Sequence, residues 1–176
     1  MGDRYTLDMG GGIAENFLSF SVARMRASQS EIQRCLDRLT EAQMAYRGGD
    51  HENSVINLLL HLAGNIRQWA IHGVGGQPDV RRREQEFVLD PHCSGAEARA
   101  RFNATVEEAA AVIAACPAAR LTEVIDPQPT GKIRNPTVLE AIYRVVSHLD
   151  HHTGQIILLT KQLTRGDLDL SIPRPR

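Results

Sequence analysis

The chain is poor in aromatic residues and cysteines and has no excess of charge of either sign. Aromatic residues make up 5% of its 176 residues, and 20 Lys and Arg face 21 Asp and Glu, for a net charge of −1. Nucleic-acid binding needs a basic groove and stacking rings, so we expect no nucleic-acid partner. The three cysteines (Cys35, Cys93 and Cys116) are widely spaced and form no CxxC pair. This pattern favours reduced thiols over a disulfide scaffold.

The sequence also lacks a long apolar run. A membrane span needs about 18 consecutive apolar residues, and none of the runs approaches that length. Residues 1–16 have no basic stretch followed by the apolar core of a signal peptide. We therefore expect a cytoplasmic protein with no membrane partner. A length of 176 residues favours a single domain that spans residues 1–176.

What the sequence has in abundance is helix-forming residues. Ala, Leu, Arg, Glu and Gln are plentiful, and β-branched residues rarely alternate with polar ones. Clusters of Gly, Pro, Asn and Asp divide the chain into four segments of helical periodicity. These segments run from about 14 to 46, 54 to 73, 94 to 117 and 136 to 166. The first of these segments could contain a break in the helix.

Local signals place the ends of these segments and the connections between them. Asn53 or Ser54 is a good N-cap for the second segment, and Ser94 with Glu97 matches a capping box. The long connection 73–91 is expected to cross one end of the molecule as an irregular loop, and residues 121–134 could form a short two-stranded hairpin. Four long helices with one long crossover predict an all-α four-helix bundle, a fold whose core often houses metal sites.

The most informative motif is a pair of histidines four residues apart. His148 and His152 lie on the same face of a helix and can bind one metal ion. Random placement of seven histidines gives about 0.3 such pairs, so the spacing alone is a weak signal. A helical projection places Arg144 and Gln155 within about 40° of His148. This face is therefore a polar strip on an otherwise apolar helix.

A second polar strip is centred on His61. Asn57, Asn65, Gln68 and His72 project within about 40° of it, on a helix otherwise crowded with leucines. Burying such groups unpaired costs several kcal/mol. They must therefore bond to one another, line a wet cavity or hold an ion.

Coordination of a divalent metal explains the histidines best. His61, His148 and His152 would supply three imidazoles from two helices and leave a fourth position open, as in catalytic zinc sites. Three polar neighbours are predicted to orient these imidazoles or a bound water: Asn65, Gln68 and Gln155. The alternative is that the histidines are ordinary hydrogen-bonded polar residues. We expect that role for the others: His51, His72, His92 and His151.

Three stretches of the sequence, 53–69, 83–87 and 135–156, resemble the DinB-like (DinB/YfiT) superfamily, and more narrowly an uncharacterised bacterial branch of it. The resemblance implies an up-down-down-up four-helix bundle, a homodimer, and a divalent metal held by His61, His148 and His152. Characterised members include thiol S-transferases that use bacillithiol or mycothiol, a mycothiol-dependent maleylpyruvate isomerase, and proteins described as metal-dependent hydrolases.

These observations favour a metal-dependent enzyme in which zinc, or nickel, activates a low-molecular-weight thiol or water. The histidines would be ligands, and no catalytic acid or base is assigned. The run Arg81–Arg83, or Arg67 with Arg144, could pair with carboxylates of a thiol substrate. A metal-dependent hydrolase and a non-catalytic metal-binding or stress-response protein remain as alternatives, and a purely structural protein would hold no metal.

Overall fold

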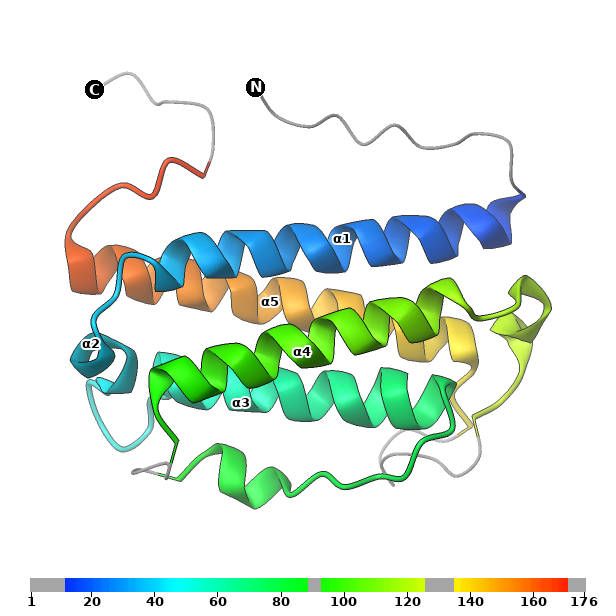
Figure 1. The fold of residues 1–176 in the computed structure, drawn as a ribbon, viewed down its shortest axis with the longest axis horizontal. Helices are drawn as coiled ribbons and strands as arrows, with labels where there is room; N and C mark the ends of the chain where they lie inside the picture. Colours follow the sequence, from blue (N-terminus) through cyan, green and yellow to red (C-terminus); the bar gives the residue numbers. More distant parts are fainter. Residues whose placement is uncertain (1–11, 89–92, 126–134, 171–176) are drawn as a thin grey trace.

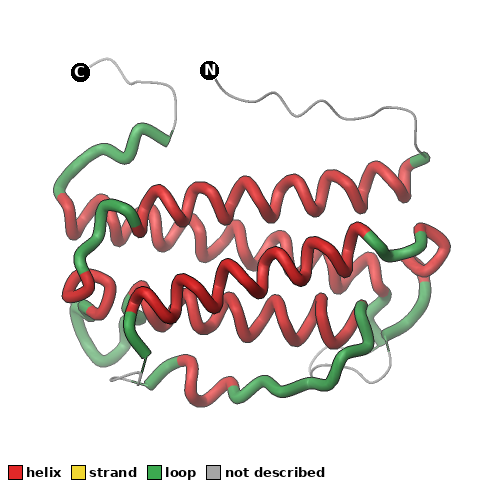
Figure 2. Tube along the Cα trace, viewed as in Figure 1, coloured by secondary structure: helices red, strands yellow, loops and turns green. Residues whose placement is uncertain are grey.

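The computed structural model describes residues 12–88, 93–125 and 135–170. This part of the chain is mostly helical and contains no strand (Figure 2). The long helices are α1 (Ile13–Leu36), α3 (Val55–Ile66), α4 (Gly95–Ala114) and α5 (Val138–Thr164), and a short helix, α2 (Glu41–Ala45), follows α1. The all-α prediction is therefore confirmed for the described residues.

The four long helices lie side by side (Figure 1). Helix α1 contacts α4 and α5, and α3 contacts the same two helices. In Figure 1, α1 and α5 begin at one end of the molecule, whereas α3 and α4 begin at the other. Large side chains from all four helices are fully buried between them, including Met25, Leu59, Phe102 and Ile142.

Side-chain caps fix the beginnings of the helices. Of the two candidates for the cap of α3, Ser54 is the one used, and it accepts from the backbone N–H of Asn57. The predicted capping box of Ser94 and Glu97 is confirmed at the start of α4. Thr137 caps α5 in the same way, which the sequence analysis did not predict. The first predicted segment does break, because α1 ends at Leu36 before α2 begins.

Two local predictions need correction. The second segment was expected to be one α-helix, but α3 ends at Ile66 and a π-helix, Arg67–Val74, continues it. The sequence did not indicate this change, because π-helices are rare and a periodic stretch continuous with an α-helix is expected to be α-helical. The hairpin prediction is wrong for 121–125: a 3-10 turn (Ala118–Thr122) is followed by one isolated bridge, Val124 to Thr137. Residues 126–134 lie outside the described residues.

The connection after the π-helix does not simply cross one end of the molecule. It runs along the outer side of α3, and its 3-10 turn, Arg83–Glu86, contacts that helix (Figure 1). This path brings the side chain of Glu86 against α3. Within the described ranges, none of the helices combines the length and apolar character that a bilayer span requires.

Candidate metal centre

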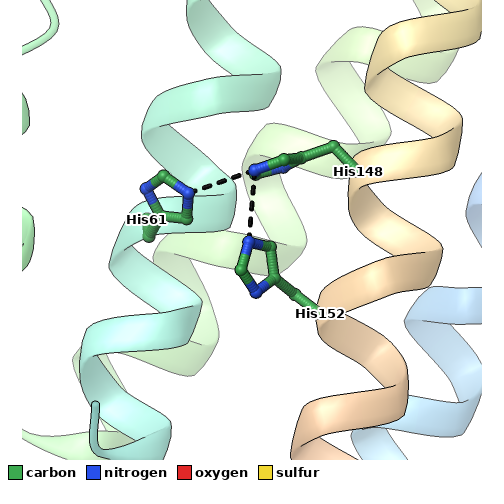
Figure 3. A group of neighbouring side chains, drawn as sticks. All are labelled: His61, His148 and His152. Atoms are coloured by element: carbon green, nitrogen blue, oxygen red, sulfur yellow. Dashed lines mark hydrogen bonds between the residues drawn. The ribbon is translucent and has the colours of Figure 1, made fainter. Parts of the chain in front are cut away.

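Three histidines from two helices meet between α3 and α5 (Figure 3). His61 lies on α3, and His148 and His152 lie one turn apart on α5. The Nε2 atom of His148 is 3.2 Å from Nε2 of His61 and 3.2 Å from Nε2 of His152. His61 is buried at 7% exposure, and the other two are half-buried. The spacing of the pair on α5 therefore does place two imidazoles beside the histidine of α3.

Hydrogen bonds on the outer side of the rings determine which nitrogens carry protons. Nδ1 of His61 is 2.8 Å from a carboxylate oxygen of Glu86, and Nδ1 of His152 is 2.6 Å from Oε1 of Gln155. Both oxygens are acceptors, so each Nδ1 donates a proton, and in the tautomer whose single proton is on Nδ1 each Nε2 presents a lone pair.

The inner nitrogens cannot all satisfy one another. A neutral His148 has a single ring proton, so its Nε2 can donate to at most one of the two facing lone pairs. Its own Nδ1 is buried and has no hydrogen-bond partner among the described residues. A cation at the meeting point would satisfy all three Nε2 lone pairs, which a hydrogen-bond network of three neutral rings cannot do.

A buried ion pair between Arg81 and Glu86 contacts the Nδ1 side of the His61 ring. The guanidinium of Arg81 donates to both oxygens of Glu86, at 2.7 and 2.8 Å, and the two side chains are only 6% and 7% exposed. Burial alone would raise the pKa of Glu86, but the hydrogen bonds from Arg81 and His61 outweigh it and hold the pKa below its ordinary value. Glu86 is therefore an ionised acceptor that fixes the ring of His61.

Glycine at position 64 makes this arrangement possible. Gly64 lies on α3 one turn after His61, and a Cβ there would collide with Oε1 of Glu86 and lie 3.2 Å from Nε of Arg81. Glycine weakens a helix interior by about 1 kcal/mol relative to alanine. The close approach of a carboxylate to the helix backbone is what the missing side chain permits here.

Burial keeps the two histidines of α5 neutral. It lowers the pKa of His148 from 6.5 to about 3, and positive charge on His152 or His61 acts in the same direction. Burial also lowers the pKa of His152, against the hydrogen bond to Gln155, which raises it. Neutral imidazole is the form that binds a metal.

Of the three polar residues predicted to orient the imidazoles, one forms a hydrogen bond with a histidine of the cluster. Gln155 contacts a histidine of the cluster directly. Gln68 does not: it accepts from Arg81 at 2.9 Å and donates to Asp79 at 2.9 Å, and so acts on His61 only through the arginine. Asn65 is buried at 5% exposure, and its Oδ1 has no hydrogen-bond partner among the residues described.

Glu86 is the site residue that the sequence analysis missed. It lies in the stretch 83–87, which resembles the family, but no role was assigned to it. A metal-binding histidine usually donates its second N–H to a carboxylate or carbonyl, so an acidic residue in that stretch was the available signal.

The arginines proposed to bind a substrate have other partners or neighbours. Arg67 donates to Glu108 at 3.1 Å, and the guanidinium of Arg144 lies 5.0 Å from the ring centroid of the buried Trp69. Arg81 is committed to Glu86. Nη2 of Arg81 lies 3.3 Å from Nδ1 of His61, but none of the three arginines forms a hydrogen bond with an Nε2 atom of the cluster. A role in binding a thiol therefore stays a prediction.

The other histidines lie outside the cluster. His51 and His151 are exposed, and Nδ1 of His72 is 2.5 Å from the carbonyl oxygen of Gln77. His92 lies outside the described residues. A cavity of about 320 Å³ adjoins the histidine cluster through Gln155, which lines it together with apolar Leu58 and Leu159 and with residues 51–53.

Together these features define an all-helical protein with a three-histidine cluster that is able to hold a metal ion. The chain belongs to the family described as "Protein of unknown function (DUF1572)", whose model matches residues 12–176. No curated protein matches the sequence. The family description names no activity, so the function has to come from the chemistry of the site.

Proposed function

We propose that this chain is a metal-dependent enzyme that binds a divalent ion through His61, His148 and His152 and uses it to activate a low-molecular-weight thiol. The observation that supports this most strongly is the convergence of three Nε2 atoms, two of which belong to rings whose Nδ1 protons are donated elsewhere. Such an arrangement is typical of histidines that ligate a metal.

The donor set fits zinc. Zinc–nitrogen bonds of 2.0–2.1 Å at tetrahedral angles put ligand nitrogens about 3.3 Å apart, and two pairs here are 3.2 Å apart. Nitrogen ligands also suit nickel. A divalent ion at this point would lower the pKa of a bound thiol or water and so supply a nucleophile near neutral pH.

The neighbouring side chains favour a thiol over water. A general base beside the metal assists attack by the bound water in many metal-dependent hydrolases. Among the described residues, the hydrogen bonds of the Nε2 atoms join them only to one another, and Glu86 lies behind His61 with its oxygens occupied. A thiol has a pKa of about 8.5, far below that of water, and therefore needs no such base once its pKa falls slightly. The cavity beside Gln155 offers room for the rest of a substrate.

We also propose that the fold is the up-down-down-up four-helix bundle of the DinB-like superfamily. The ring of contacts among α1, α4, α3 and α5 supports this, as does the shared starting end of α1 and α5 in Figure 1. The three stretches that resemble the superfamily contain the whole histidine cluster and Glu86.

The test is turnover by zinc-loaded protein with a panel of low-molecular-weight thiols and an electrophilic acceptor, beside a hydrolysis panel without thiol. We expect consumption of the acceptor that depends on both the thiol and the metal and is lost in His148→Ala. Turnover without thiol would instead indicate activation of water. Stoichiometric metal with no turnover in either panel would contradict the enzymatic proposal and leave a metal-binding protein.

A further inference from the structure

A second cavity, of about 100 Å³, lies between α3, α4 and the connection that carries Glu86. Four arginines line it: Arg67, Arg81, Arg82 and Arg101. The acidic residue in its lining is Glu86, so four positive charges face one negative charge in a chain whose net charge is −1. Charge of one sign concentrated in a cleft with apolar walls raises the local concentration of ions of the opposite sign.

Among the described residues, the two carboxylates that form ion pairs with arginines of this cavity are Glu86 and Glu108. Glu86 binds Arg81 and His61, and Glu108, which does not line the cavity, binds Arg67. Within the part of the chain that the structure describes, the guanidinium groups of Arg82 and Arg101 form no ion pair. Two arginines from different elements therefore face one cavity with unused donors.

We propose that this arginine cavity binds an oxyanion, the phosphate or carboxylate group of a small molecule. Guanidinium groups present paired N–H donors whose spacing matches the oxygens of such groups. Arg82 from the connection and Arg101 from α4 supply the free donors, and Arg67, which also lines the cavity, forms a half-exposed pair with Glu108. The small volume selects a single compact anionic group over a whole substrate.

The cavity is separate from the metal cluster. None of the three histidines lines it, although Glu86 and Arg81, which do, both contact Nδ1 of His61. We expect binding of the oxyanion to require no metal, because the unused donors belong to Arg82 and Arg101. Failure of the oxyanion proposal can therefore be distinguished from failure of the proposed metal-dependent activity.

Inorganic phosphate and acetate, titrated separately by calorimetry into the full-length chain, test this proposal. Each titration is made on the protein as purified and after dialysis against a chelator. The variants are Arg82→Gln and Arg101→Gln, and the matched control is Arg38→Gln, an exposed arginine outside the cavity. Circular dichroism of every variant checks that its helix content is unchanged.

We expect saturable binding that survives chelation, weakens about tenfold or more in Arg82→Gln and Arg101→Gln, and is unchanged in Arg38→Gln. Tighter binding of phosphate identifies a phosphorylated ligand, and tighter binding of acetate a carboxylate. Absence of binding for both anions, binding lost on chelation, or equal affinity in all variants would overturn the proposal.

Discussion

Exchange of Glu86 for glutamine keeps the size of this buried side chain and removes its negative charge. Arg81 is then left as a buried cation, since its side chain is 6% exposed and its guanidinium donates to both oxygens of Glu86. Breaking a buried ion pair in this way costs about 3–5 kcal/mol of folding free energy. Because glutamine retains one acceptor oxygen, we expect about 3 kcal/mol for Glu86→Gln.

The same exchange acts on the metal. Loss of a carboxylate that orients a ligating histidine lowers metal affinity by about 10–100-fold, and His61 donates directly to Glu86. Glu108→Gln is the matched control, because it removes a carboxylate from an exposed arginine pair whose side chains are 35% and 47% exposed. Such exposed pairs contribute about 0–1 kcal/mol.

Urea unfolding followed by circular dichroism measures the first effect, and competition for zinc with a fluorescent chelator measures the second. Glu86→Gln should lower both the free energy of unfolding and the affinity for zinc. Glu108→Gln should lower the free energy of unfolding by no more than the contribution of a surface ion pair and should leave zinc affinity unchanged. If the two variants unfold within about 0.5 kcal/mol of each other and bind zinc equally, Glu86 does not support the site as we describe.

Three further predictions concern neighbouring residues. Gly64→Ala improves helix propensity, yet it should lower stability and zinc affinity because its Cβ displaces Glu86; a gain in stability would show that the loop moves away freely. Gln155→Leu removes the acceptor of His152 Nδ1 and should weaken zinc binding about tenfold while changing stability by less than about 1 kcal/mol; unchanged affinity in the chelator competition would refute this role. Metal-free protein should lose stability as pH falls below 6.5, because the pKa of His148 is about 3 in the folded chain and the unfolded chain therefore takes up the proton first. The free energy of unfolding should change by at most about 1.4 kcal/mol per pH unit through this residue. A urea midpoint that stays constant between pH 6.5 and 4 would contradict this prediction.

The sequence alone was sufficient to predict the helical elements and the pair of histidines on α5. Short-range rules were sufficient, because a serine cap and the i, i+4 spacing of His148 and His152 are fixed within one or two turns of a helix. The addition of His61 needed only the observation that another helix carries a polar strip centred on a histidine. These are the parts of the structure that periodicity encodes.

The missing parts depend on contacts between distant residues. Glu86 reaches His61 because an irregular connection packs on α3 at Gly64, and no periodic pattern marks that approach. The arginine cavity has the same origin, since Arg82 and Arg101 come from separate elements. The π-helix after Ile66 continues α3 directly, and because π-helices are rare this stretch was expected to be α-helical.

The metal content of tag-free protein, measured by elemental mass spectrometry, tests the central claim most directly. Wild type is compared with His61→Ala and His148→Ala, and Arg38→Gln serves as the control. We predict close to one equivalent of zinc or nickel in wild type and the control, and loss of that metal in both histidine variants. Wild-type protein that holds no metal even after incubation with zinc would contradict the claim that the three histidines form a metal centre.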